Sequence, residues 1–424
     1  MVALGRQDGF VPGWVGMHEV KAPDWPAQGR LDETRALGVY VHVPFCRTRC
    51  PYCDFAAVVL NPIPHDEYAD AVVAEITARA SWFRGEKAPD LRSIYFGGGT
   101  PGLWRGEAIG RVIETVRDLL EAQGPLEITV EANPGELSFE QAARLVAAGV
   151  NRVSLGMQAF QDHLLAAIGR HHGVAAIAEA VRAVRAAGID NLCADLMFGL
   201  PGQTLDDWRQ SLESLVAFAP EHITAYALTI ERATPFGAWE RAGKMQRPNE
   251  ELVATMYETA HQFLQAAGFE HYEISSYARP GRRSAHNTLY WAGGAYLGVG
   301  AAASSFRPLA DGTGWRFSNP RSLTTYLRSV QVHQGHLMPA KVEFRTAKEL
   351  ENEALWLALR TVEGVDRQSH ASRYGCDPLA DGDRERAAAK CAEAGWLLVT
   401  PEFLRLTPAG FLFADEVAVR LWRV

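Results

Sequence analysis

From residue 38 onward, two patterns of hydrophobic and polar positions alternate along the chain. Short apolar runs, typical of buried strands, are expected at 39–43, 93–96, 127–131, 152–155, 191–197 and 222–229. Segments with apolar positions every three or four residues follow them, and helices are expected at 68–83, 109–120, 139–148, 174–187, 205–218 and 250–267. Six strand–helix units in about 230 residues predict an α/β fold. A partial (β/α)6 barrel is favoured over an open doubly wound sheet.

The rest of the chain differs in pattern and suggests further boundaries. Residues 1–35 are rich in Gly, Pro and Trp and are expected to be an irregular N-terminal extension before a barrel at 36–270. An aromatic and glycine-rich connecting region is expected at 271–345. Residues 346–424 predict a smaller α+β, winged-helix-like domain, with helices at 349–359 and 383–394, a hairpin at 396–406 and a helix from about 408. The expected wing of this domain lacks a basic cluster, so a lid or a partner-docking role is preferred to DNA binding.

The expected carboxyl ends of the strands carry glycines and polar residues. A cysteine loop follows the first strand, residues 97–101 read GGGTP, and Gln158 and Asp195 lie at or near later strand ends. In (β/α) barrels this edge carries the active site, so these residues are expected to form one site.

Three cysteines, Cys46, Cys50 and Cys53, stand in a C-x3-C-x2-C run. A structural zinc site closes with four protein ligands, usually as two cysteine pairs, and the remaining cysteines are isolated. A 4Fe-4S cluster on three thiolates leaves one iron open for chemistry. The alternative is a zinc site of three cysteines and one histidine, using His42. The other interpretation of His42 is a residue that orients the cysteine loop.

Other candidates have two readings each. The glycines before Thr100 allow close approach of the backbone to a ligand, or make only a tight turn. Glu131 could accept hydrogen bonds from a ribose diol, or lie at the surface. Arg170 could face the site, or belong to a solvated turn. Asp195 stands in an apolar strand, where a carboxylate needs a partner or a ligand.

Composition sets the context of this site. The 424 residues are 47% hydrophobic and 22% charged, as expected for a globular protein, and the net charge of −8 argues against a general nucleic-acid partner. Six scattered cysteines are too few for a disulfide framework, and a thiolate cluster needs a reducing compartment. There is no signal peptide and no apolar run long enough to span a membrane, so a cytoplasmic protein is expected.

Seven motifs together carry a family resemblance. They are HVPFCRTRCPYCDF (42–55), YFGGGTP (95–101), EANPG (131–135), SLGMQAF (154–160), DLMFGLPGQT (195–204), YEISSYA (272–278) and HNTLYW (286–291). In this order they resemble the oxygen-independent coproporphyrinogen III oxidase-like radical S-adenosylmethionine (SAM) family. The resemblance implies that Cys46, Cys50 and Cys53 ligate a 4Fe-4S cluster whose open iron takes SAM. It also implies SAM contacts from Tyr40, Tyr52, Gly98, Gly99, Thr100, Glu131, Gln158, Arg170 and Asp195. Some of these contact a second SAM in the oxidase branch.

Two departures choose between branches of the family. The oxidases carry a fourth cysteine where this chain has Phe55, and they have a longer N-terminal region. Asp54-Phe55 and the HNxxYW motif are instead similar to the HemW-type heme chaperones. This resemblance implies a chaperone that binds heme, a 4Fe-4S cluster and SAM and passes heme to an acceptor hemoprotein. The alternative is an oxygen-independent coproporphyrinogen III oxidase, which decarboxylates propionates to vinyl groups. A third hypothesis is a zinc-stabilised binding protein.

The heme ligand and the partners are further expectations. His286 lies among aromatic residues and glycines, a composition that suits a flat macrocycle with an axial imidazole, so it is the heme candidate. The alternative is that His286 and Trp291 pack the seam between the barrel and the tail. Reduced flavodoxin or ferredoxin is the candidate electron donor. Transient membrane association and a homodimer are also considered.

Overall fold

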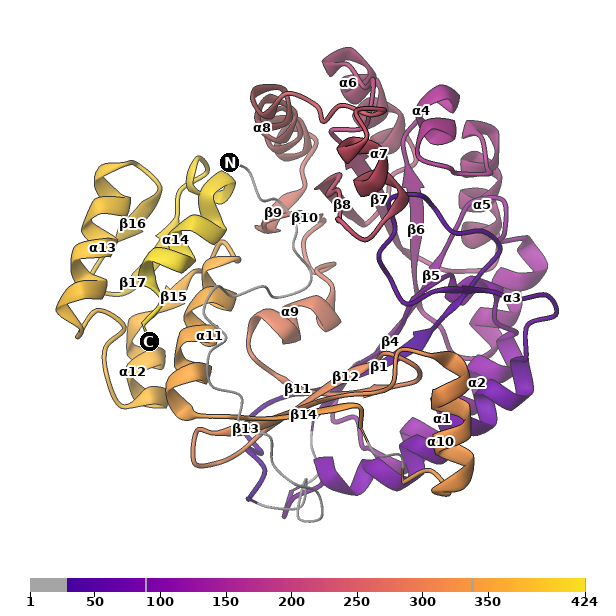
Figure 1. Cartoon of the computed structure of the whole chain (residues 1–424), viewed down its shortest axis with the longest axis horizontal. Coiled ribbons are helices and arrows are strands. Elements are labelled where there is room, and N and C mark those ends of the chain that lie inside the picture. The colour runs from indigo at the N-terminus through magenta and orange to yellow at the C-terminus, as the bar shows by residue number, and fades with distance from the viewer. Residues whose placement is uncertain (1–28, 88–89, 337–338, 424) are drawn as a thin grey trace.

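A twelve-stranded sheet organises the chain, in the order β14-β13-β12-β11-β1-β4-β5-β6-β7-β8-β10-β9. The computed structural model describes residues 29–87, 90–336 and 339–423. Six neighbouring strands at its centre run parallel: β1 (Leu37–Val43), β4 (Leu91–Gly98), β5 (Glu127–Ala132), β6 (Arg152–Gln158), β7 (Asn191–Phe198) and β8 (His222–Ala227). The sheet curves into an incomplete ring with helices outside it (Figure 1). The prediction of a partial (β/α)6 barrel is therefore confirmed.

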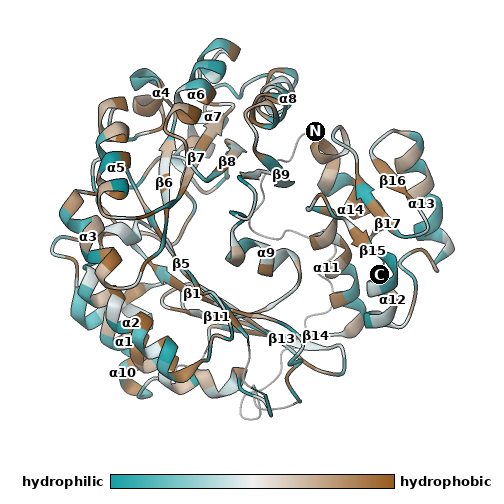
Figure 2. Cartoon of the chain, turned by 180° about the vertical axis from the view of Figure 1, so that it is seen from behind, coloured by the Kyte–Doolittle hydropathy of each residue, from teal (hydrophilic) through white to brown (hydrophobic). Residues whose placement is uncertain are grey.

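The parallel strands form where the sequence is apolar over several consecutive residues, because both of their faces are covered. Every residue of β6 is buried, and in β1 all but Tyr40 are. Figure 2 shows hydrophobic residues along β1 and β7 and a mixture of hydrophobic and hydrophilic residues along the surrounding helices. The main core therefore lies between the sheet and its outer helices.

The helices of the barrel are amphipathic and follow the strands in turn. In α2 the buried Ile109, Val112 and Val116 recur every three or four residues and face the sheet. The bounds are α1 (His65–Arg79), continued by η1 (Ala80–Phe83), η2 (Pro101–Leu103), α2 (Gly106–Leu119), α3 (Phe139–Ala147), α4 (Asp162–Ala167), α5 (Val174–Ala186), α6 (Leu205–Ala217), α7 (Pro235–Arg241) and α8 (Glu250–Ala266). The predicted strands and helices are all found, most within two or three residues. The short helices α4 and α7 were not predicted, since six or seven residues carry too little periodicity.

The segment 271–345 differs from the connecting region that the sequence predicts, because it builds both edges of the main sheet. At one edge β10 (Ser276–Ala278) pairs antiparallel with β8, and β9 (Glu270–Glu273) pairs antiparallel with β10. At the other edge β11 (Ala295–Val299) pairs parallel with β1, followed by β12 (Ser304–Pro308), β13 (Gly314–Ser318) and β14 (Lys341–Arg345). Some of its aromatic residues and glycines, such as Tyr296 and Gly298, are thus strand residues, whereas Tyr290 and Trp291 lie in a helix. The helix α10 (Leu323–Val332) lies beside α1 (Figure 1).

The C-terminal domain is α+β, as predicted, and combines helices with a small three-stranded sheet. Its elements are α11 (Ala347–Leu359), β15 (Val365–Asp366), α12 (Arg367–Tyr374), α13 (Gly382–Glu393), β16 (Leu397–Val399), β17 (Phe403–Leu406), η3 (Gly410–Phe413) and α14 (Ala414–Leu421). The predicted hairpin is present as β16 and β17. The strand β15 and the helix α12 were not predicted.

This domain spans the opening between the two edges of the main sheet (Figure 1). Glu353 of α11 forms ion pairs with Arg316 of β13 at 3.0 Å and Arg345 of β14 at 2.8 Å. On the opposite edge, Thr361 forms a bridge with Glu273 of β9. The domain therefore joins the two ends of the sheet and completes the ring.

Two further points concern the ring and the termini. The helix α9 (Ala285–Trp291) lies inside the ring and contacts β1, β4 and β11 (Figure 1). Most of the predicted N-terminal extension, residues 1–28, lies outside the described residues; Leu31 forms a bridge with Leu309. Within the described ranges, none of the helices has the length and apolar character needed to cross a membrane.

Candidate functional site

The three cysteines share one loop between β1 and α1. Two short parallel strands, β2 (Phe45–Cys46) and β3 (Val58–Val59), hold the ends of this loop together. We call residues 46–60 the cysteine loop. Inside it the backbone N–H of Cys53 donates to the carbonyl of Cys50 at 3.1 Å. All three thiols are free and partly exposed, so they are accessible to a ligand.

The pKa values of these thiols reflect burial and proximity. Burial raises the pKa of Cys46 to about 11, and the neighbouring Cys53 and Cys50 add to the shift. Burial also raises the pKa of Cys53. Binding a metal centre would therefore displace protons from these thiols. Among the described residues, no group of three or more His, Cys, Asp or Glu side chains is already arranged around a metal position, and this includes the three cysteines.

His42 takes part in holding the cysteine loop. Its Nε2 lies 3.0 Å from the carbonyl oxygen of Ala56 in that loop, and its Nδ1 lies 3.3 Å from the hydroxyl of Tyr40. A carbonyl only accepts, so Nε2 carries the proton and Nδ1 accepts from Tyr40. Burial lowers the pKa of His42 and keeps the ring neutral. The imidazole thus orients the loop and does not point at a zinc position.

The glycine run after β4 packs directly against the start of the cysteine loop. The N–H of Gly99 donates to the carbonyl of Val43 at 2.9 Å, and that of Thr100 to Phe45 at 2.7 Å. A Cβ on Gly99 would lie 2.7 Å from the carbonyl oxygen of Phe45, so no side chain fits. A ligand's protonated amino group only donates hydrogen bonds, so backbone carbonyl oxygens of this run are the groups that would bind it.

The carboxyl group of Glu131 lies in the interior of the ring, beside this glycine run. Its Oε2 accepts the N–H of Gly98 at 3.1 Å, and its Oε1 accepts the hydroxyl of Tyr95 at 2.8 Å. Burial raises the pKa of Glu131 to about 7; the hydrogen bond from Tyr95 opposes the shift, and the nearby Asp195 adds to it. The alternative of a surface position is therefore excluded, and the carboxyl group titrates near neutral pH.

Arg170 connects several of the predicted residues. Its Nη2 donates to the hydroxyl of Tyr52 at 3.0 Å, and its Nη1 donates to the side-chain oxygen of Asn133 at 2.6 Å. Asn133 in turn donates to Thr100 at 3.1 Å, and Thr100 donates to the sulfur of Cys46 at 3.6 Å. The solvated-turn interpretation of Arg170 is thus wrong. Asn133, which follows β5 in the motif EANPG, thus links Arg170 to Thr100.

Gln158 and Asp195 lie on the next two strands. Gln158 has a left-handed backbone, with φ of 66°, at a bulge between β6 and β7, and its Oε1 accepts the hydroxyl of Tyr226 at 2.8 Å. Asp195 accepts the hydroxyl of Ser154 at 2.9 Å. Burial raises the pKa of Asp195. The strand therefore supplies the polar partner that the sequence argument demanded for this acid.

Below Asp195 the structure shows a buried chain of polar side chains that the sequence did not indicate. The sulfur of Cys193 lies 3.3 Å from Asp195 Oδ1 and 3.0 Å from Nδ1 of His222, whose Nε2 lies 2.7 Å from the hydroxyl of Tyr272. Arg152 of β6 is also buried near these side chains. Period-2 positions on β6, β7 and β8 are the only sequence signal that could have found this chain.

His286 is packed inside the ring. Its side chain is 1% exposed, with Nδ1 2.8 Å from Ser93 Oγ and Nε2 3.0 Å from the hydroxyl of Tyr290. The ring stacks on Tyr95, with centroids 4.9 Å apart. Burial lowers the pKa of His286 to about 3. Both ring nitrogens of His286 are thus hydrogen-bonded in this structure, and iron could reach Nε2 only after Tyr290 is displaced. Trp291 faces the C-terminal domain, where Arg360 stacks over its ring.

The fold and this site define a radical SAM protein. The family model of the radical SAM superfamily matches residues 40–215, from the first strand to α6. Coproporphyrinogen III oxidase (HemN) from Escherichia coli, a solved structure, has the same fold, with a TM-score of 0.77 and 22% identity over 92% of this chain and 90% of that chain.

Three relatives that are described as heme chaperones define the family within this class. The chain is 38% identical to the heme chaperone HemW of Synechocystis over 77% of this chain and 78% of the relative. It is 34% identical to HemW of Bacillus subtilis over 89% of this chain, and 30% identical to HemW of Escherichia coli over 90%, each covering 97% of the relative. The chain therefore belongs to the HemW family of radical SAM proteins. This family membership implies a 4Fe-4S cluster and SAM.

Proposed function

We propose that this chain is a heme chaperone that binds heme, a 4Fe-4S cluster and SAM and transfers heme to an acceptor hemoprotein. The observation that carries the proposal is its identity to relatives described as heme chaperones over most of both chains. The sequence after Cys53 supports it, because Phe55 stands where the oxidase branch has a fourth cysteine. We further propose that the protein acts in the cytoplasm.

The cluster is assigned to Cys46, Cys50 and Cys53. They fit this group because one short loop presents all three thiols, with Thr100 close to Cys46 and the carbonyl oxygen of Gly169 4.0 Å from the sulfur of Cys50. When bound, the cluster supplies an open iron for SAM and one-electron chemistry. The protein contributes the loop geometry and limits access of water to it.

SAM is assigned to the interior of the ring next to this loop. The residues proposed to contact it are Tyr40, Tyr52, Gly98, Gly99, Thr100, Glu131, Gln158, Arg170 and Asp195. The close packing of the glycine run leaves no room for a Cβ at Gly98, which would lie 2.5 Å from the ring of His42. Glu131 is placed to accept hydrogen bonds from a ribose, and Arg170 fixes Tyr52 and Asn133 at the rim.

Heme is assigned to the region of α9, with His286 as the iron ligand. Burial keeps this imidazole neutral, which is the form that coordinates iron. Tyr290 lies one turn further along the same helix, so coordination through Nε2 would require the Tyr290 side chain to turn away from the imidazole.

The experiment that tests the proposal is an anaerobic assay of reconstituted protein with SAM, a reductant and coproporphyrinogen III, with a parallel heme titration. Stoichiometric heme binding without porphyrinogen conversion, followed by appearance of heme in an added apo-hemoprotein, is the expected result. Formation of protoporphyrinogen IX would instead establish the alternative, an oxygen-independent coproporphyrinogen III oxidase. Zinc without acid-labile sulfide would contradict both.

A further inference from the structure

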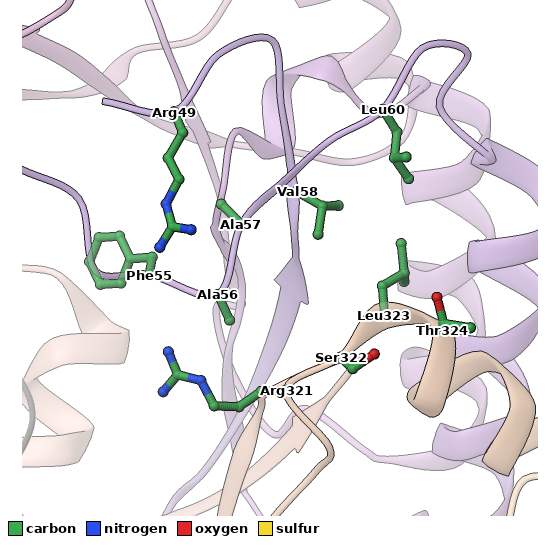
Figure 3. A pocket seen from close by; sticks show the side chains of 10 residues that line it. All are labelled: Arg49, Phe55, Ala56, Ala57, Val58, Leu60, Arg321, Ser322, Leu323 and Thr324. Carbon is green, nitrogen blue, oxygen red and sulfur yellow. The ribbon is translucent and has the colours of Figure 1, made fainter. Parts of the chain in front are cut away.

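The outer side of the cysteine loop forms a hollow with the start of α10. It has a volume of about 350 Å³ and is lined by residues of two segments, 49–60 and 321–324 (Figure 3). Arg49, Phe55 and Leu60 come from the cysteine loop, and Arg321 and Leu323 come from the second segment. The hollow therefore lies directly over the loop that carries the proposed cluster ligands.

The charge of this hollow is opposite to that of the whole chain. Two arginines line it and none of its lining residues is acidic, whereas the net charge of the chain is −8. Arg321 donates to the backbone carbonyl of Asp54 at 3.4 Å, a contact that leaves its charge unneutralised. Figure 3 shows the guanidinium groups of Arg49 and Arg321 at the end of the hollow near Phe55. An anionic partner would meet both of them there.

The same loop exposes unusually large apolar side chains. Phe55 is 53% exposed, Val59 55% and Leu60 42%. An exposed apolar cluster with arginines beside it has the composition of a protein interface, in which aromatic residues and Arg are enriched. No described residue of the chain covers these side chains sufficiently to bury them.

We propose that this surface, formed by Arg49, Phe55, Leu60 and Arg321, docks a small acidic electron-transfer protein. The inference rests on the proposed cluster. Arg49 precedes Cys50, and Phe55 follows Cys53 by two residues, so a partner seated here lies against the ligand loop. One electron leaves the partner's low-potential flavin or iron–sulfur cofactor and reduces the cluster by one electron, so the step is balanced.

Two other occupants fit the surface less well. Heme needs an axial ligand, and the lining contains no imidazole, thiol, thioether or phenol. An anionic membrane would gain only about 1 kcal/mol from each of the two arginines, less than the usual polybasic anchor provides. The acidic protein uses both the charge and the apolar side chains.

The test compares R49E/R321E with the wild type, both reconstituted with the cluster. The control is Arg386→Glu, which reverses an equally exposed arginine on α13. Binding of flavodoxin, as an acidic probe, is measured by titration at low and at high salt. The double variant should bind about tenfold or more weakly at low salt and lose most of the salt dependence, because both reversed charges oppose the probe. Phe55→Ser should weaken binding without changing its salt dependence.

A second readout separates docking from the cluster itself. Reduction of the cluster by photoreduced deazaflavin, a small uncharged reductant, should be equal in all variants, whereas reduction by flavodoxin should slow in R49E/R321E. Equal flavodoxin binding by the wild type and the double variant would overturn the docking surface. Loss of binding to anionic vesicles, with flavodoxin binding unchanged, would assign the surface to a membrane. Failure of the wild type to assemble any cluster would instead contradict the proposed function.

Discussion

The carboxyl group of Glu131 and the backbone N–H of Gly98 lie 3.1 Å apart, which joins the end of β5 to the glycine run after β4. Because the residues belong to adjacent strands, this contact places a titrating acid at the centre of the proposed SAM site. Its pKa of about 7 follows mainly from burial.

The pH dependence of SAM binding should follow Glu131. Above about pH 7 the group is ionised and accepts hydrogen bonds as a carboxylate, which are stronger than those of a neutral acid. As pH falls through about 7, SAM affinity of the reconstituted protein should drop by about tenfold, corresponding to ~1.4 kcal/mol. Glu131→Gln should bind weakly at every pH in isothermal titration. Glu107→Gln, a change at an exposed position of α2, should keep the pH profile of the wild type. If the SAM affinity of Glu131→Gln still depended on pH, the titrating group would be another residue.

The cluster should depend on each of three thiols. Replacing Cys46, Cys50 or Cys53 singly with Ala removes one ligand from an already three-ligand site, so the visible absorbance and the acid-labile sulfide after anaerobic reconstitution should be lost. Cys376→Ala, which removes an exposed cysteine of the C-terminal domain, serves as the control. A single variant with a full cluster would show that its cysteine is not a ligand. Exposure of the wild type to air should bleach the absorbance.

Heme affinity should respond in opposite directions at His286 and Tyr290. His286→Ala removes the proposed ligand and should lower heme affinity at least tenfold in a spectral titration. Tyr290→Phe removes the hydroxyl that competes with iron for Nε2, so it should tighten binding by a few-fold, corresponding to about 1 kcal/mol. His333→Ala, at an exposed position, is the control. Unchanged affinity in both variants would place heme elsewhere.

The C-terminal domain should lose stability in acid through Glu351. Burial raises the pKa of this side chain, but hydrogen bonds from His370 and Arg384 outweigh burial and bring it to about 2. A pKa held below the usual 4.5 stabilises the folded state above that pH. This contribution should therefore disappear as pH falls from about 4.5 towards 2.

Removing the charge tests the same network at neutral pH. Glu351→Gln removes the carboxylate that pairs with Arg384, whose Nη2 donates to Oε2 of Glu351 at 2.9 Å. The free energy of unfolding, measured in urea, should fall by about 2–3 kcal/mol. Glu385→Gln changes an exposed carboxylate of α13 and should have little effect. Equal stability of the two variants would mean that the ion pair contributes nothing.

Much of the architecture could be read from the chain, because periodicity is strong where one face of an element is buried. The parallel strands β1 and β4–β8 and their major helices were predicted from short apolar runs and 3.6-residue spacing. The edges of the sheet were not, since β11–β14 are made of glycines, aromatics and arginines whose pattern resembles a loop. Their strand character comes from pairing with β1 and with each other.

Part of the candidate site could likewise be predicted from the sequence, and part could not. The cysteine spacing, the glycine run and the position of Asp195 are local features, and the motifs that contain them predict a radical SAM protein. Contacts across strands are not local: Arg170 reaches Tyr52 over 118 residues of chain, and Cys193 meets His222 over 29. No spacing rule links such pairs.

The sequence by itself therefore determined the family, the barrel and the three thiols of the cysteine loop, because each depends on neighbours along the chain. Only the tertiary structure decided that His286 is packed within the ring, that Glu131 titrates near neutral pH, and that Arg49 and Arg321 line one hollow beside the cysteine loop. Burial and electrostatic surroundings are set by residues distant in sequence, and they exist only once the chain has folded.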